Sequence, residues 1–176
     1  MAAKVAILLV AGLLSAGVFC EISQSQKTHE QSAFGAEDVK LQNPIPLPDG
    51  VKQLLRKDPY VADSLKGEVS RPEYLPDSWF MASDVHLAGP DEKDVVVVGQ
   101  CPICGANFAP FWIFRPKGSG YEKIFFTGAL GIEIKQHRTN GYRDIESGIV
   151  TMQTPQESVW RFDSEKYQRG QGTQTK

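Results

Sequence analysis

The residues best suited to chemistry are two cysteines, Cys101 and Cys104, in the segment CPIC. A Cys-x-x-Cys pair can be a redox dithiol, half of a zinc site, or a small structural disulfide. Glycine and proline surround the pair, which places it in a turn. A turn suits a disulfide, because residues three apart in a strand lie roughly 10 Å apart and the bridge needs Cα atoms within about 7 Å.

The surroundings of the pair favour the structural disulfide. A redox dithiol works best with its first thiol at a helix N-terminus, and residues 105–110 (GANFAP) are a poor helix start. A zinc site needs two more ligands, and neither His86 nor His137 has a characteristic spacing to the cysteines. We therefore predict a Cys101–Cys104 disulfide, no metal and no cofactor.

A second set of candidates lies in the segment NGYRDI. Arg143 and Asp144 could bind a charged ligand or act as acid and base. We favour a simpler interpretation, in which Asp144 caps a turn and Arg143 is solvated or joins a weak surface ion pair. The candidate ligand-binding residues are Trp112, Arg115, Tyr142, Arg143 and Asp144. Since no Gly-x-Ser-x-Gly elbow or Ser-His-Asp grouping is present, we predict a protein that is not an enzyme.

The N-terminus has the layout of a secretory signal. Lys4 precedes an apolar run over residues 5–14, and small residues follow at 15–17. Cleavage could fall after Gly17 or after Cys20, and lipidation of Cys20 is a further alternative, although the bulky Phe19 fits a lipobox poorly. We predict export to the periplasm, the cell exterior or a lipid anchor, where the oxidising environment favours a disulfide.

Composition sets the domain organisation. The chain has 176 residues, with 19 basic against 21 acidic side chains and no basic stripe, which argues against nucleic acid as a partner. Beyond a signal peptide at 1–20, no run is long enough to span a membrane. Residues 21–48 are polar and end in a proline-rich stretch, so we predict a flexible tether there, one domain over 49–169, and a polar tail at 170–176.

Apolar patterning predicts helices first and strands afterwards. Helical spacing covers residues 50–57, with Asp49 as N-cap, and 60–65. The runs VVVV (95–98) and FWIF (111–114) indicate central strands covered on both faces. Further strands are expected at 79–87, 121–127, 130–135, 142–145, 148–152 and 159–162, with turns at 116–120 and 139–141.

The connections between these strands are short, which requires antiparallel neighbours. We predict an α+β fold in which one or two N-terminal helices pack on a curved, mostly antiparallel sheet of about six or seven strands. A small closed barrel is the alternative. If the helices cover only one face, aromatic side chains such as Trp112 would be exposed on the other face and would mark a partner site.

Several segments together carry a resemblance. They are GAN (105–107), FWIFR (111–115), TNGYRDI (139–145) and WRFD (160–163) before Tyr167. Over roughly residues 79–167 the chain resembles a group of small uncharacterised secreted bacterial proteins. That resemblance implies no reaction. In that group a cysteine often follows Gly-Ala-Asn, whereas residues 108–111 hold none, so no role of the cysteines carries over.

From these observations we predict a secreted or envelope-tethered binding module without enzymatic activity, with inhibition of an envelope hydrolase as one form that the activity could take. Its partner would be an envelope protein or ligand that the sequence does not identify. The alternative is a thiol-disulfide or metal-handling protein that uses Cys101 and Cys104.

Overall fold

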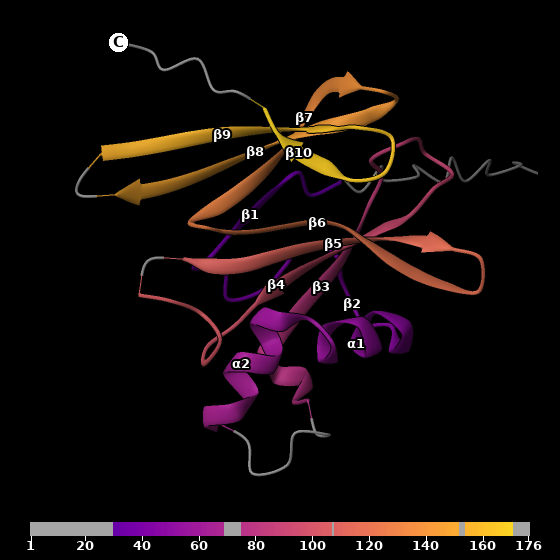
Figure 1. The fold of residues 1–176 in the computed structure, drawn as a ribbon. Coiled ribbons are helices and arrows are strands. Elements are labelled where there is room, and N and C mark those ends of the chain that lie inside the picture. The colour runs from indigo at the N-terminus through magenta and orange to yellow at the C-terminus, as the bar shows by residue number, and fades with distance from the viewer. Residues whose placement is uncertain (1–29, 69–74, 107, 152–153, 171–176) are drawn as a thin grey trace, which may run out of the picture.

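The computed structural model describes residues 30–68, 75–106, 108–151 and 154–170, which form three layers (Figure 1). Two helices cover one five-stranded sheet, and a second five-stranded sheet packs on the opposite face. The elements in chain order are β1 (Ala33–Gly35), β2 (Pro44–Ile45), α1 (Asp49–Arg56), α2 (Pro59–Glu68), a 3₁₀ turn (Asp77–Trp79), β3 (Phe80–Val85), β4 (Asp94–Gly99), β5 (Ala109–Lys117), β6 (Gly120–Ala129), β7 (Gly131–Thr139), β8 (Tyr142–Thr151), β9 (Thr154–Phe162) and β10 (Tyr167–Arg169).

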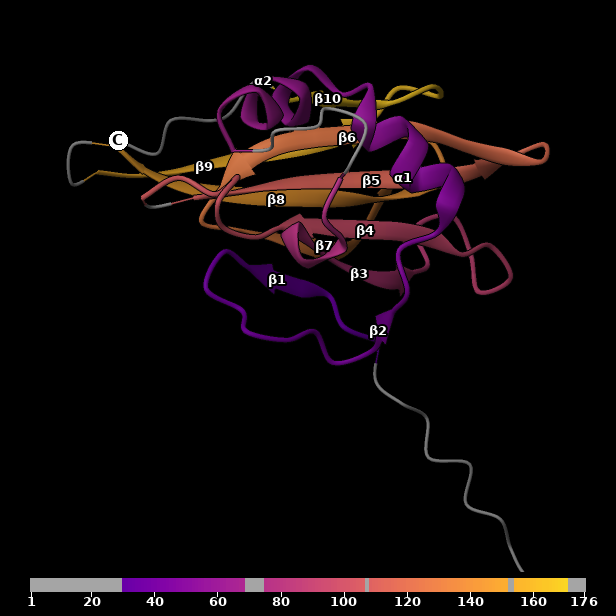
Figure 2. The ribbon, with the colours of Figure 1, turned by 90° about the horizontal axis from the view of Figure 1, so that it is seen from below.

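The two sheets differ in what covers them. The helix-side sheet has the order β2-β3-β4-β5-β6, and the distal sheet has the order β1-β7-β8-β9-β10. Every pairing between these strands is antiparallel, as the short connections predict. Figure 2 looks onto the helix-side sheet, with α1 and α2 over β5 and β6.

The α+β class with mostly antiparallel strands is confirmed, but the expectation of one sheet of six or seven strands is wrong, and so is the closed barrel. The chain changes sheets at Leu130, the single residue between β6 and β7. The Leu130 N–H donates to Gly148 O on β8 (2.8 Å), and Leu130 O accepts from Ala36 N–H (2.7 Å). The crossing therefore costs no backbone hydrogen bonds at this residue.

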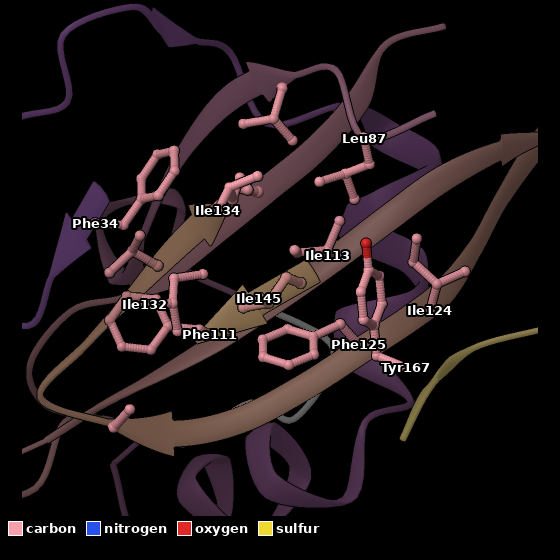
Figure 3. Close-up of a cluster of buried hydrophobic side chains, with 14 of the residues drawn as sticks. Phe34, Leu87, Phe111, Ile113, Ile124, Phe125, Ile132, Ile134, Ile145 and Tyr167 are labelled. Atoms are coloured by element: carbon pink, nitrogen blue, oxygen red, sulfur yellow. The ribbon is translucent and has the colours of Figure 1, made fainter. Parts of the chain in front are cut away.

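Side chains of β4 and β5 alternate between two cores, which is why these strands read as continuous apolar runs. Val96, Val98, Phe111 and Ile113 face the distal sheet, and Figure 3 shows Phe111 and Ile113 among side chains of both sheets. Val95, Val97, Trp112 and Phe114 face the helices. The predicted central position of the VVVV strand is confirmed, since β4 is the middle strand of its sheet and buried throughout.

Both predicted helices are present with slightly different ends. Asp49 is not the N-cap of α1: Pro48 holds that position, no side chain caps it, and Asp49 lies in the first turn. There its carboxylate still suits the positive end of the helix dipole. Val51 and Leu55 are the buried residues of α1, and they anchor the helix on the helix-side sheet.

The predicted flexible tether at 21–48 needs correction over its described part. Phe34 is buried between the sheets, and β1 pairs with β7. Leu41 is also buried, and β2 pairs with β3. Apolar residues are few in this stretch, but two of them are buried and the stretch adds an edge strand to each sheet, so residues 31–48 belong to the folded domain.

Candidate functional site

The cysteine pair lies in the loop that joins β4 to β5, and the two residues are bonded as a disulfide with Cα atoms 4.7 Å apart. Ile103 anchors the loop, because its side chain is buried in the helix-side core, the core between the helices and the helix-side sheet. Tyr60 OH donates to Ile103 O (2.7 Å), and Ile103 N–H donates to Gln100 O (3.0 Å). Cys101 is exposed at the outer side of this anchored loop, and Cys104 is half-buried.

Two phenylalanines, one in this loop and one on the neighbouring strand β6, are partly exposed. Phe108 and Phe126 each expose 37% of their surface. The Phe108 ring lies against two glycines: a Cβ on Gly105 would come within 2.1 Å of it, and one on Gly128 within 3.2 Å. We call Phe108, Phe126 and Gly128 the aromatic edge patch, because Phe126 and Gly128 belong to β6, the last strand of its sheet.

The exposed Phe126 ring is held at its inner side by a network of side chains. It packs on Tyr60 (centroids 5.7 Å apart) and on Trp112 (5.4 Å). Lys123 Nζ lies 5.6 Å from the Phe126 centroid and forms an ion pair with the buried Asp58 (2.5 Å). The ring is therefore fixed while part of it faces solvent.

Trp112 is not available to a ligand. It is completely buried, and its ring packs against Tyr60, Phe80 and Phe126. Its Nε1 has no hydrogen-bond partner among the described residues. The expectation that one sheet face would be left open fails here because both faces of the helix-side sheet are covered.

Arg115 and Tyr142 come together at the end of the sandwich where β5 meets β8. Arg115 Nη1 donates to Tyr142 OH (3.3 Å), and Arg115 Nε pairs with Glu122 (2.5 Å). The guanidinium also lies 5.3 Å from the centroid of Phe162, which stacks on Tyr142 (3.9 Å). This arrangement joins the two sheets and uses most of the polar groups of Arg115.

Arg143 is buried rather than solvated, which corrects the sequence-based interpretation. Its guanidinium donates to the carbonyl oxygens of Ile134 (3.0 Å) and Lys135 (2.8 Å) and forms an ion pair with Glu30 (3.2 Å). The β7–β8 register shifts between Ile134 and Arg138, so the ladder is interrupted beside those carbonyls. The Arg143 guanidinium therefore donates hydrogen bonds to these carbonyls where the strand pairing is interrupted.

Asp144 does not cap a turn, and it lies on the opposite face of β8 from Arg143. Its Oδ2 lies 2.8 Å from His137 Nδ1 and 3.7 Å from Arg161 Nε. Its Oδ1 is buried without a hydrogen-bond partner in the described part of the chain. Arg143 and Asp144 therefore do not form one acid–base site.

Sequence reasoning considered His137 only as a possible zinc ligand and missed its pairing with Asp144, although the turn at Asn140 and Gly141 signals it. Both turn residues have positive φ, 51° and 85°. The two-residue turn pairs Arg138 with Arg143, so the next residues on the two strands, His137 and Asp144, lie close to each other. The side chain of His137 is 73% exposed, so the buried carboxylate orients an imidazole at the surface.

Two further polar residues inside the molecule were also missed. Asp94 begins β4 and is buried, with Oδ2 accepting the Leu87 N–H (3.3 Å). Burial raises the pKa of Asp94 to about 6. Tyr167 donates its hydroxyl to Arg143 O (2.6 Å), and burial raises its pKa above the ordinary value. An acidic residue directly before four valines is the one sequence signal that indicates Asp94.

A shallow hollow of about 360 Å³ lies on the distal sheet. Its shape comes from glycines, because Gly35, Gly131 and Gly148 are neighbours across three strands. Its rim is acidic, from Asp38, Glu133, Glu146 and Glu157. None of the residues that the sequence singled out lines it.

The described ranges contain neither a group of possible metal ligands nor a helix that could cross a membrane. No three or more His, Cys, Asp or Glu side chains within them are placed to hold a metal ion together. None of their helices is long and apolar enough to cross a membrane. Cys20, the candidate for lipidation, lies outside the described residues.

The protein is an α+β, mostly β protein, in which a sandwich of two antiparallel sheets carries a helical layer on one side. No protein-family model, curated protein or solved structure matches the chain.

Proposed function

We propose that this protein is an exported or envelope-tethered binding module without catalytic activity, and that it binds another envelope protein through the aromatic edge patch. An envelope hydrolase that it inhibits is one class of partner. One observation carries this proposal: Phe108 in the disulfide loop and Phe126 on the edge strand are both held in place by their neighbours while part of each ring is exposed.

Exposure of these rings is not required by the fold. A phenylalanine at a surface position leaves apolar area in water that burial would stabilise. Two glycines, Gly105 and Gly128, leave the space in which the Phe108 ring lies. Aromatic side chains that are rigid and partly exposed are typical of the centres of protein interfaces.

The strand that carries Phe126 supports a protein partner in particular. β6 is ten residues long and lies at the edge of the helix-side sheet. An edge strand presents backbone N–H and C=O groups that can pair with an extended segment of another chain. Lys123 and the bulge opposite Ile113 and Phe114 limit unspecific pairing of this edge.

Export is supported by the leader-like N-terminus, and the disulfide fits an oxidising compartment. The resemblance to secreted bacterial proteins points the same way.

The test is capture from an extract of the cell envelope with the tagged mature chain. Phe126→Ser and Phe108→Ser should each lower the amount of the specific partner by about tenfold, as expected for a buried aromatic anchor. Val150→Ser is the matched control, because Val150 is 47% exposed on the distal sheet. Equal capture by all three variants and the parent would contradict the proposal.

A thiol-disulfide function is the second candidate, and the exposure of Cys101 favours it. The pair is followed by a turn and β5 rather than by a helix, so the arrangement that lowers a thiol pKa is not present there. A metal-handling role would need ligands beyond those that the described residues bring together. Turnover of a model disulfide by the reduced protein, or bound zinc near one ion per chain, would favour this candidate over the binding module.

A further inference from the structure

The disulfide and Phe108 of the aromatic edge patch belong to one loop. Cys104 is followed directly by Gly105, whose N–H donates to Phe108 O (2.8 Å) and on which the Phe108 ring lies. We propose that the Cys101–Cys104 bridge is a site of thiol–disulfide exchange that switches the patch between a binding and a non-binding state. This inference rests on the proposed function and adds its regulation.

The exposure of the two cysteines determines which sulfur atom an external thiolate attacks. Cys101 is exposed and Cys104 is half-buried, so an incoming thiolate reaches the Cys101 sulfur first. The thiolate forms a new S–S bond with Cys101 while the Cys101–Cys104 bond breaks and the electron pair leaves on Cys104, which takes up a proton. A second thiol then attacks the sulfur of the first thiol in the mixed disulfide and releases Cys101. The sum is one protein disulfide and two thiols converted to two cysteines and one external disulfide.

The bridge is not part of the framework that holds the fold. β4 pairs with β5 from Val95 to Val98, before the loop begins, and both strands are buried between the two cores. The bridge joins residues only three positions apart. Loop-closure stabilisation grows with loop length, so a bridge this short contributes least to global stability. Reduction is therefore expected to loosen the loop and to leave the sandwich folded.

The loosened loop would release Phe108. Ile103 stays anchored in the helix-side core and by Tyr60, so the freedom gained falls on Gly105 and Phe108, the two residues that the hydrogen bond joins. Once the Gly105–Phe108 hydrogen bond opens, the ring is no longer fixed on Gly105 and Gly128. A partner would then have to order the ring on binding, which weakens affinity.

The experiment compares the full mature chain oxidised, reduced with a dithiol and alkylated, and as the double variant Cys101→Ala/Cys104→Ala. Hydrogen exchange at the Gly105 amide should become at least about tenfold faster in both reduced forms, with amides of β4 and β5 unchanged. Binding of the captured partner should weaken about tenfold in the same forms. Phe126→Ser, kept oxidised, is the control that weakens binding without changing exchange at Gly105.

The outcomes separate the two proposals. Equal Gly105 exchange in oxidised and reduced chains would overturn the switch even if no partner has been found. Equal partner binding in both states would overturn the switch and leave the binding module intact. Unfolding of β4 and β5 on reduction would also overturn it, because the bridge would then be structural. Failure of the oxidised chain to capture any partner that depends on Phe126 would overturn the binding module and, with it, the switch that rests on it.

Discussion

At the scale of single residues, Asp94 is a carboxyl group whose titration is changed by burial in the fold. Its carboxyl is buried at the start of β4, where it accepts the Leu87 N–H. Burial raises its pKa from 3.8 to about 6. The hydrogen bond from Leu87 opposes this rise most strongly, Glu92 adds to it, and Arg115 and His86 also lower the pKa. The folded protein therefore binds this proton more tightly than the unfolded chain does.

This raised pKa predicts a sign for the pH dependence. The stabilisation from protonated Asp94 is complete below about pH 4 and is lost as pH rises through about 6. Asp94→Asn keeps an acceptor for Leu87 and carries no charge. We expect the variant to be more stable than the parent at pH 7.5, by up to about 3 kcal/mol, and equal to it near pH 3.5. Urea unfolding at both values measures this.

Asp91→Asn, in the exposed loop before β4, is the control. It should leave the difference in the free energy of unfolding between pH 7.5 and pH 3.5 the same as in the parent. If Asp94→Asn is less stable than the parent at pH 7.5, the carboxylate is stabilised by its surroundings and our account of its burial is wrong.

At the scale of elements, the segment before the first helix is the most informative. Polar composition predicts a tether, but Phe34 is buried and its strand pairs with β7. Residues that are few in number can still order a segment when each is fully buried, because one phenylalanine removes a large apolar area from water.

Phe34→Ala should lower the free energy of unfolding by about 3–5 kcal/mol, because it leaves a cavity between the sheets. Val39→Ala is the control in the same segment: Val39 is 93% exposed, so its loss should change stability by less than about 0.5 kcal/mol. Denaturant midpoints of both variants give the comparison. Similar small effects would mean that residues 31–48 do not contribute to the fold in solution.

At the scale of the whole molecule, the two sheets are joined by more than their shared core. Arg138, on the surface of the distal sheet, donates from Nη1 to the carbonyls of Leu87 (2.5 Å) and Ala88 (2.7 Å) in the loop after β3. The Arg143 N–H also donates to Leu87 O (3.0 Å). These bonds hold one end of the sandwich closed.

Arg138→Ala is therefore expected to lower the free energy of unfolding by about 1–2 kcal/mol, which is large for an exposed side chain. Thermal unfolding followed by circular dichroism measures it. Lys40→Ala, exposed in the loop between β1 and β2, should have little effect. A change no larger than that of Lys40→Ala would show that the inter-sheet bonds exchange with water without loss.

Local rules were sufficient for much of the molecule. The helices, the central position of β4 and the turn at Asn140 and Gly141 follow from patterns within a few residues. A cysteine pair in a glycine- and proline-rich turn likewise predicted the disulfide that the structure contains. The resemblance to secreted bacterial proteins, and export itself, stay predictions.

Only the tertiary structure decided which face of each strand is covered and by what. Alternation along β5 shows that Trp112 and Ile113 point to opposite sides, but the coverings come from α1, α2 and the distal sheet, far away in sequence. The same holds for Arg143 and Asp144, adjacent residues of which one enters the interior and the other orients a surface histidine. The alternation of side chains between two faces follows from the sequence of the strand itself. Burial of each face depends on segments that are distant in the sequence, and no local pattern predicts how they pack.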